Sequence, residues 1–244
     1  MPRSLIGQSR TLAGTRTLAG NRLPQSLLAG LVSYYKFDEN TGTVANDSVG
    51  INTGHWSGTG DSWTTGKINS GISTNGAGGI DCGNDASIQL TSAFTYAFWV
   101  KMTSLNAFSQ FLGKDSGGTR GTGIYIHSSG KPYIVVHIGG NEYNNYDGTN
   151  TTLPTGSWHF IVATLDTSHK LKYYYDTKQE TATVSLSGNV NNGSSNFYIS
   201  SGFNGVIDEV GVWNRTLTVP EIQTLYNSNT GYQYPFAVNR TLVV

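Results

Sequence analysis

Short runs of apolar and β-branched residues, separated by clusters of Gly, Asn, Ser and Pro, repeat along most of the chain. The first run is residues 31–37, Leu-Val-Ser-Tyr-Tyr-Lys-Phe, and it ends at a turn rich in Asp, Asn and Gly. Similar runs follow at 94–102, 108–113, 123–127, 133–138, 159–165, 170–175, 196–200 and 203–213. Regularly spaced short runs of this kind predict an all-β protein, an antiparallel sandwich or barrel.

One segment predicts a helix. Thr218 is a suitable N-terminal cap, Pro220 and Glu221 fall in the first turn, and apolar residues recur at 222, 225 and 226. We expect about two turns of helix. We expect this helix to cover an edge of the sandwich.

The N-terminal 30 residues have a different pattern. Arg-Thr-Leu-Ala-Gly at 10–14 returns at 16–20, six residues later. A period of six fits neither an α-helix nor a heptad, but in an extended chain it places Leu12 and Leu18 on one side. We interpret residues 1–29 as an extended arm that becomes ordered against a partner. A disordered terminus is the alternative.

Charge divides the chain at the same place. The 15 basic and 15 acidic residues balance, yet the first acidic residue is Asp38, so residues 1–30 carry +4 and the remainder −4. The asymmetry indicates two parts with different roles. The arm residues expected to make the attachment are Arg3, Arg10, Leu12, Arg16, Leu18 and Arg22.

Composition excludes several classes of protein. Charged residues make up 12% of the chain, about half the usual share. The single cysteine, Cys82, excludes an intrachain disulfide and a Cys-rich zinc cluster. No apolar run approaches the roughly 20 residues of a membrane span. The N-terminus also lacks the apolar core of a secretory signal. We therefore expect no membrane insertion, and four arginines without interleaved aromatic residues do not predict nucleic-acid binding.

Five motifs carry a family resemblance. Residues 31–42 and 46–50 resemble the opening of laminin-G-like jelly-roll domains, which belong to the concanavalin-A-like lectin/glucanase superfamily. Residues 94–101, 156–166 and 203–217 are similar to three later strands of that family. The resemblance implies a two-sheet jelly roll over residues 30–232, followed by an extended tail at 233–244. One hairpin departs from the family pattern, because residues 173–178 lack its glycine.

The motifs do not predict catalysis. The glucanases of this superfamily carry E-x-D-x-x-E on one strand, and this sequence has no such motif. The nearest carboxylate pair is Asp208-Glu209, and neighbouring residues of a regular strand point to opposite faces. We therefore expect no enzymatic activity, and a glycoside hydrolase is the least favoured alternative.

A structural calcium ion is compatible with the resemblance. Asp38 ends the first strand and Asp208 lies in the last, and these strands are neighbours in the family, so the two carboxylates could share Ca2+. The alternative is that Asp38 caps a turn and Asp208 accepts from backbone amides.

Sugar recognition needs exposed aromatic rings beside amides and carboxylates. The densest such cluster is Tyr143, Asn144, Asn145, Tyr146 and Asp147, for which a plain polar hairpin loop is the alternative. A second cluster contains His55, Trp56, Asp61 and Trp63, whose tryptophans could instead pack over the sandwich edge.

Two functional hypotheses follow and are compatible with one another. The first is a structural protein of an assembly, a virion surface or fibre-like component of, for example, a phage, attached through residues 1–30 and 233–244 to other structural proteins or to copies of itself. Its jelly roll would be displayed outward and bind host cell-surface glycans. The second is a free carbohydrate-binding lectin module of a bacterial extracellular protein. Both place the protein on a virion surface or outside the cell.

Overall fold

The computed structural model describes residues 26–106, 109–115, 119–139, 141–144, 151–180 and 184–236. The predicted arm residues Arg3, Arg10, Leu12, Arg16, Leu18 and Arg22 lie outside this range, as do residues 237–244 of the predicted tail.

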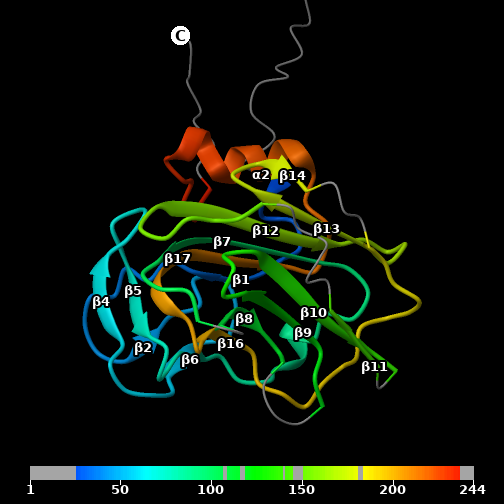
Figure 1. The fold of residues 1–244 in the computed structure, drawn as a ribbon, viewed down its shortest axis with the longest axis horizontal. Coiled ribbons are helices and arrows are strands. Elements are labelled where there is room, and N and C mark those ends of the chain that lie inside the picture. Colours follow the sequence, from blue (N-terminus) through cyan, green and yellow to red (C-terminus); the bar gives the residue numbers. More distant parts are fainter. Residues whose placement is uncertain are drawn as a thin grey trace, which may run out of the picture.

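Two antiparallel sheets face one another (Figure 1). The main strands of the first sheet lie in the order β14 (Lys178–Gln179), β13 (Lys170–Tyr175), β12 (Trp158–Leu165), β7 (Phe94–Met102), β17 (Asn204–Trp213), β5 (Ser70–Asn75) and β4 (Ser62–Thr65). Two further strands join this sheet: β1 (Leu31–Tyr35) pairs with β17, and β15 (Val184–Ser185) pairs with β13. The second sheet has the order β11 (Asn141–Asn144), β10 (Pro132–Ile138), β9 (Thr122–Ile126), β8 (Ser109–Gly113), β16 (Tyr198–Ser201), β6 (Ile80–Asp81), β3 (Gly54–Trp56) and β2 (Val44–Ala45). The predicted antiparallel sandwich is confirmed.

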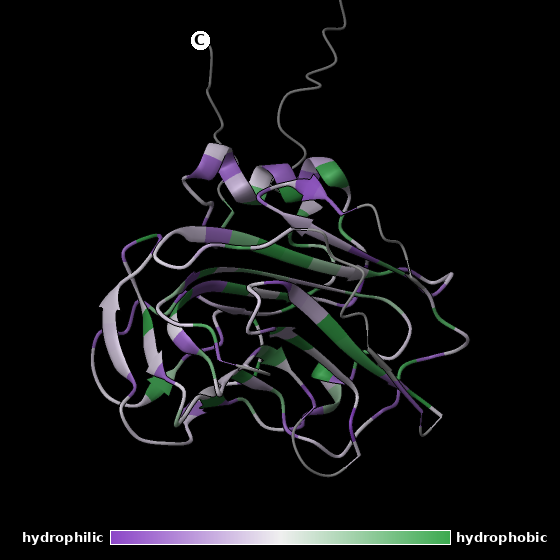
Figure 2. Cartoon of the chain, viewed as in Figure 1, coloured by the Kyte–Doolittle hydropathy of each residue, from purple (hydrophilic) through white to green (hydrophobic). Residues whose placement is uncertain are grey.

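The main core fills the space between the sheets. Side chains from β7, β8, β9 and β10 meet there, including Phe98, Phe111, Ile124 and Ile134, all almost fully buried. Hydrophobic residues are concentrated on these central strands and hydrophilic residues on the loops (Figure 2). Such a core supplies most of the favourable free energy of folding.

A helical layer covers the outer face of the first sheet (Figure 1). It consists of α2 (Val219–Tyr226) and the 3-10 helix η2 (Asn227–Asn229), while a second 3-10 helix, η1 (Ala86–Ile88), lies elsewhere. Ile222 and Leu225 of α2 pack with Trp99, Phe160 and Trp213 of the sheet. The helix is where the sequence predicted it, but it covers a sheet face and not the sandwich edge. Strand β7 is therefore buried on both faces, which explains its unbroken apolar run.

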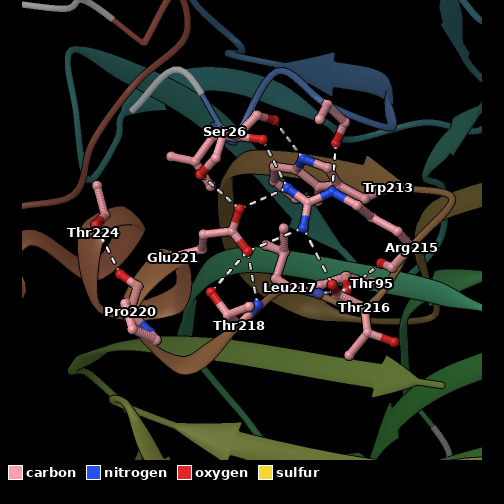
Figure 3. Close-up of polar contacts among 12 residues, drawn as sticks. Ser26, Thr95, Trp213, Arg215, Thr216, Leu217, Thr218, Pro220, Glu221 and Thr224 are labelled. Atoms are coloured by element: carbon pink, nitrogen blue, oxygen red, sulfur yellow. Dashed lines mark hydrogen bonds and ion pairs between the residues drawn. The ribbon is translucent and has the colours of Figure 1, made fainter. Parts of the chain in front are cut away.

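The start of the described chain is part of this layer. Leu27 is fully buried, and its carbonyl oxygen accepts a 2.7 Å hydrogen bond from Trp213 Nε1. Ser26 Oγ donates to Glu221 of α2 at 2.7 Å (Figure 3). At the other end, Phe236 is buried and its ring meets that of Tyr34. Residues 26–29 and 233–236 thus pack on the jelly roll.

Candidate functional site

The outer face of the second sheet lies opposite the helical layer. On β9 and β10 the inward side chains, such as Ile124 and Val136, belong to the core. The strand pleat then directs the alternate residues outward. These are Gly123 and Tyr125 on β9 and Tyr133, Val135 and His137 on β10.

One row of directly paired residues crosses this face from strand to strand. It runs through His55, Asp81, Tyr198, Gly113, Gly123, Val135 and Asn144. The row joins β3 at one end to β11 at the other. The two predicted sugar-binding clusters, which begin on these two strands, therefore stand at opposite ends of a single sheet.

A carboxylate cluster occupies the β9–β11 end. Asp115 Oδ2 accepts a 2.7 Å hydrogen bond from the Tyr125 hydroxyl, and Asp115 Oδ1 lies 2.7 Å from His137 Nε2. The Asp115 side chain is 4% exposed and that of His137 is 10% exposed. Burial, followed by the negative charge of Asp115, raises the pKa of Tyr125 far above its usual value, so the phenol keeps its proton. The hydrogen bond holds Tyr125 in a fixed position, whereas Asp115 Oδ1 and His137 Nε2 are close neighbours without an aligned hydrogen bond between them in the described structure.

The cluster reaches solvent through Arg120 and Glu142. Arg120 Nε lies 3.7 Å from Asp115 Oδ1, and its Nη1 lies 3.9 Å from Glu142 Oε2. Both side chains are nearly half exposed. We refer to Asp115, Arg120, Tyr125, His137 and Glu142 as the Asp115 cluster. It offers donors and acceptors of both charges to a polar ligand.

The ring of Tyr125 is placed by a glycine. A Cβ atom at Gly123 would lie 2.5 Å from Tyr125 Cε2 and 3.0 Å from the Cβ of Asp115. Tyr125 therefore leans over Gly123 toward Asp115, and it also stacks on Tyr133 with ring centroids 5.3 Å apart. A larger residue at 123 would prevent this arrangement.

An open pocket of about 330 Å3 lies at the β3–β6 end of the face. Asp81 accepts from Gly83 N and from Asn196 Nδ2, both at 2.9 Å, so its carboxylate and the Asn196 amide hold each other in place. We call this the rim pocket; among the residues that line it are His55, Trp56, Ser57, Asp81, Cys82 and Asn196. It combines an aromatic ring, a carboxylate, an amide and an imidazole within one hollow.

The predicted sugar-binding residues are described only in part. Tyr143 and Asn144 belong to β11, where they pair with Val136 and Val135. Asn145, Tyr146 and Asp147 lie outside the described residues. In the second cluster, Trp56 contacts both the core and Trp63, with ring centroids 5.7 Å apart. Trp56 thus packs over the sandwich edge, as the alternative expected, and also lines the rim pocket.

The two carboxylates of the predicted calcium pair, Asp38 and Asp208, accept hydrogen bonds from backbone N–H groups of the turn at residues 67–70. Asp208 Oδ2 accepts from Lys67 N and Ile68 N, at 2.7 and 3.0 Å. Asp38 Oδ1 accepts from Ser70 N at 3.2 Å, and its Oδ2 accepts from the Gln233 side chain at 2.8 Å. These are the hydrogen bonds that the alternative expected, and the calcium assignment stays a prediction. In the described part of the chain, no three His, Cys, Asp or Glu side chains gather as a metal-binding group.

The expectation that Asp208 and Glu209 point to opposite faces is wrong. Asp208 pairs directly with Trp99, and Glu209 is hydrogen-bonded to the Tyr34 hydroxyl, so both carboxylates lie on the helical side of the first sheet. The reason is a β-bulge: Glu209 has φ +52°, and the register with β7 shifts between 208 and 211. Both residues are buried beneath the helical layer. Burial raises the pKa of Glu209 to about 8 and that of Asp208 well above its usual range.

Comparison with known proteins agrees with this architecture. A family model described as the concanavalin A-like lectin/glucanases superfamily matches residues 74–223, more than half of the chain. The chain belongs to the concanavalin A-like lectin/glucanase superfamily. No curated protein matches it in sequence.

Solved structures of this superfamily fold extend the comparison. Domain 4 of AbnA, an extracellular arabinanase from Geobacillus stearothermophilus solved with arabinotriose, is 21% identical with a TM-score of 0.65 over 80% of this chain and 98% of its own. The binding domain of Paraclostridial Mosquitocidal Protein 1 is 18% identical with a TM-score of 0.64 over 83% of this chain. This chain spans 53% of that domain. At these identities the likeness shows a shared fold.

Sequence reasoning missed the Asp115 cluster. Its members are spread from 115 to 142 and form no motif. The available signal was the alternation on 132–138, where the outward position 137 carries a histidine between core residues. The pairing of β9 with both β8 and β10 then brings Asp115 and His137 together.

Proposed function

We propose that this member of the concanavalin A-like superfamily is a carbohydrate-binding module without catalytic activity of its own. Its ligand lies on the outer face of the second sheet, over the rim pocket. The observation that carries the proposal is the composition of this pocket: His55, Asp81 and Asn196 offer polar atoms for hydroxyls, and Trp56, whose ring also packs on the core, adds an apolar wall. A volume of about 330 Å3 falls in the range of small-ligand sites.

The fixed geometry of the polar pair supports this assignment. The hydrogen bond from Asn196 to Asp81 sets both side chains before any ligand arrives. Preorganised groups lose less conformational entropy on binding, which raises affinity. A hydrophobic ligand would leave the carboxylate desolvated, so a polyhydroxyl ligand fits better.

The second end of the face is proposed to extend the site. Neighbouring strands are about 4.8 Å apart, so the row from β3 to β11 spans roughly 30 Å, enough for several sugar rings. Tyr143, Asn144, Asn145, Tyr146 and Asp147 are the residues proposed to contact a long glycan there. The complex of the Geobacillus domain with arabinotriose supports an oligosaccharide as the class of ligand.

Titration calorimetry and a glycan array on the full chain test the proposal, with arabino-oligosaccharides included. We expect Trp56→Ala and Asp81→Ala to weaken binding at least tenfold, a loss of about 1.4 kcal/mol or more. Trp158→Ala is the matched control, because this partly buried tryptophan belongs to the first sheet. Retained binding in both pocket variants, or the absence of binding at millimolar sugar, would overturn the assignment.

We also propose that residues 1–25, together with 237–244, attach the module to an assembly, a virion surface or another extracellular structure. The four arginines before residue 26 and the repeated Arg-Thr-Leu-Ala-Gly support an attachment arm. Because Ser26 and Leu27 pack on the jelly roll, the truncation that tests the arm begins at Ser26. We expect light scattering to give more chains per particle for the full chain than for residues 26–244. The same number of chains in both would contradict self-assembly through the arm.

A further inference from the structure

Asp81 places a carboxylate in the rim pocket that no cation of the described chain pairs with. Its Oδ1 accepts from Gly83 N and its Oδ2 from Asn196 Nδ2, both at 2.9 Å, and both donors are neutral. Among the described residues, no Lys, Arg or His forms an ion pair with Asp81. A carboxylate has about four acceptor positions, so some remain open to a ligand.

The pocket itself supplies little positive charge. Its described lining residues include no Lys or Arg, and His55 is the only side chain among them that can become a cation. Just beyond Gly83, the Lys114 amine donates to Asn84 Oδ1, and Lys114 is only 5% exposed. This lysine is therefore directed to an amide inside the protein and leaves the charge of Asp81 to the pocket.

The sheet neighbours of Asp81 are suited to a polar ligand. Strand pairing places His55 and Tyr198 directly beside Asp81 in the row that crosses the outer face. Burial, followed by the negative charge of Asp81, raises the pKa of Tyr198. The phenol thus keeps its proton and can donate to a sugar hydroxyl. One carboxylate therefore stands among hydroxyl, amide and imidazole groups.

We propose that the rim pocket selects sugars that carry a protonated amine, such as glucosamine units, and that Asp81 is the residue that selects them. This inference rests on the proposed sugar binding and names the class of sugar. A hydrogen bond between an ammonium and a carboxylate is about twice as strong as one between neutral groups. A uronate would instead bring two negative charges together, so the pocket should disfavour acidic sugars.

The charge of the jelly roll favours the same class of ligand, but less specifically. Residues 31–244 carry a net charge of −4, which attracts any cationic glycan to the surface. Salt screens this general attraction beyond about 8 Å at physiological ionic strength. A test must therefore separate Asp81 from the charge of the whole domain.

Titration calorimetry on the full chain makes this separation at about pH 6, where an amine of ordinary pKa is protonated. The probes are short oligosaccharides of glucosamine, of its N-acetylated form and of galacturonate. We expect the wild type to bind the glucosamine oligomer about tenfold more tightly than the N-acetylated one, and the galacturonate oligomer least. Asp81→Asn should reduce the preference for the amine to less than about twofold. The N-acetylated oligomer should still bind this variant, because the Asn196 amide can turn to accept from the introduced amide.

Asp85→Asn is the matched control. Asp85 is exposed in the loop after β6, and its side chain accepts from Ser87 N, a capping role that asparagine performs equally well. The control removes the same charge from the domain and should keep the preference for the amine. A preference lost equally in both variants would assign it to the general charge and contradict selection by Asp81.

A measurement on the wild type keeps the test independent of whether Asp81→Asn folds. Raising the salt from about 0.01 M to about 1 M shortens the screening length from about 30 Å to about 3 Å. Binding of the glucosamine oligomer should weaken, and binding of the N-acetylated oligomer should not change. Equal affinities for the two oligomers would overturn the selection and leave sugar binding in place. Absence of binding to all three oligomers and to the neutral glycans would overturn the proposed function and this inference together.

Discussion

The guanidinium of Arg215 and the carboxylate of Glu221 form a two-pronged ion pair, with Nη2–Oε1 and Nη1–Oε2 distances of 2.8 and 3.0 Å. The same carboxylate accepts from Thr218 N and Oγ1, which caps α2, and from Ser26 Oγ (Figure 3). One side chain thus links the start of the described chain, the residues after β17 and the first turn of the helix.

Removing this carboxylate should loosen the whole helical layer. We expect Glu221→Ala to lower the free energy of unfolding by about 3 kcal/mol, because it leaves a partly buried arginine unpaired and removes the helix cap. Urea denaturation measures the change. Gln223→Ala, at an exposed position of the same helix, is the control and should cost less than about 0.5 kcal/mol. Equal effects of the two substitutions would refute the linking role.

The same pair predicts acid sensitivity. Burial by itself would raise the pKa of Glu221, but its hydrogen bonds, the one from Arg215 foremost, outweigh burial and lower this pKa to about 2, from an ordinary 4.5. A depressed pKa contributes stability that is complete above pH 4.5 and is lost as the pH falls toward 2. The unfolding free energy of the wild type should therefore fall more steeply than that of Glu221→Gln between pH 4.5 and 2. Parallel curves would contradict the prediction.

Glu209 predicts the opposite dependence at higher pH. Burial raises its pKa to about 8, with Asp38 adding to the rise and the hydrogen bond from Tyr34 opposing it. A raised carboxyl pKa means that the folded state binds the proton more tightly, so this contribution is fully present below pH 4.5 and is lost as the pH rises to 8. A tenfold difference in proton affinity between the folded and unfolded states corresponds to about 1.4 kcal/mol.

We therefore expect Glu209→Gln to flatten the decline in unfolding free energy between pH 5 and 8. Asp208, whose pKa burial also raises, remains in this variant, so part of the decline should persist. Lys36→Gln is a useful comparison, because Lys36 opposes the rise and its loss should steepen the decline. A wild-type curve that is level over this range would refute the assignment.

The regular elements were predictable because each obeys a local rule. The apolar runs of β7 and β10 report strands that are almost entirely buried, and Thr218, Pro220 and Glu221 mark the beginning of α2. The short strands between residues 44 and 81 were not predicted. Runs of two to six residues, rich in Ser, Thr and Gly, carry too little apolar periodicity to be recognised as strands.

On the outer face of the second sheet, only the two ends of the proposed site, near β3 and β11, could be predicted from the sequence. Aromatic and amide residues near 56 and 143 are visible as local clusters, but their placement on one sheet depends on strand order across eight strands.

The β-bulge at Glu209 could not be predicted from the sequence, for a different reason. A positive φ is usually marked by Gly or Asn, and here a glutamate adopts it because Tyr34 and Gln233 hold its carboxylate.

The hairpin between β13 and β14 also carries backbone strain. Its two-residue turn places Asp176 at φ +48° and Thr177 at φ +71°, where the family pattern has a glycine. A β-branched residue at positive φ is strained, so Thr177→Gly should raise the free energy of unfolding by about 1 kcal/mol. Thr167→Gly, at a position of the neighbouring turn that has no positive φ, is the control and should lower the free energy of unfolding. Thermal denaturation compares the two, and a destabilised Thr177→Gly would contradict the strain.

The Asp115 cluster predicts a strong coupling between two side chains. Tyr125→Phe removes the hydroxyl that donates to Asp115 and should cost about 1–3 kcal/mol, because the carboxylate is buried and loses a donor. In an Asp115→Asn background the same change should cost less, since no charge is left unpaired. A double-mutant cycle by urea denaturation should give a coupling energy of about 1–2 kcal/mol. Tyr198→Phe, on the same face but without a contact to Asp115, should show additive behaviour in that background. Additivity of the Tyr125 and Asp115 substitutions would mean that the aspartate is satisfied by His137 and Arg120 alone.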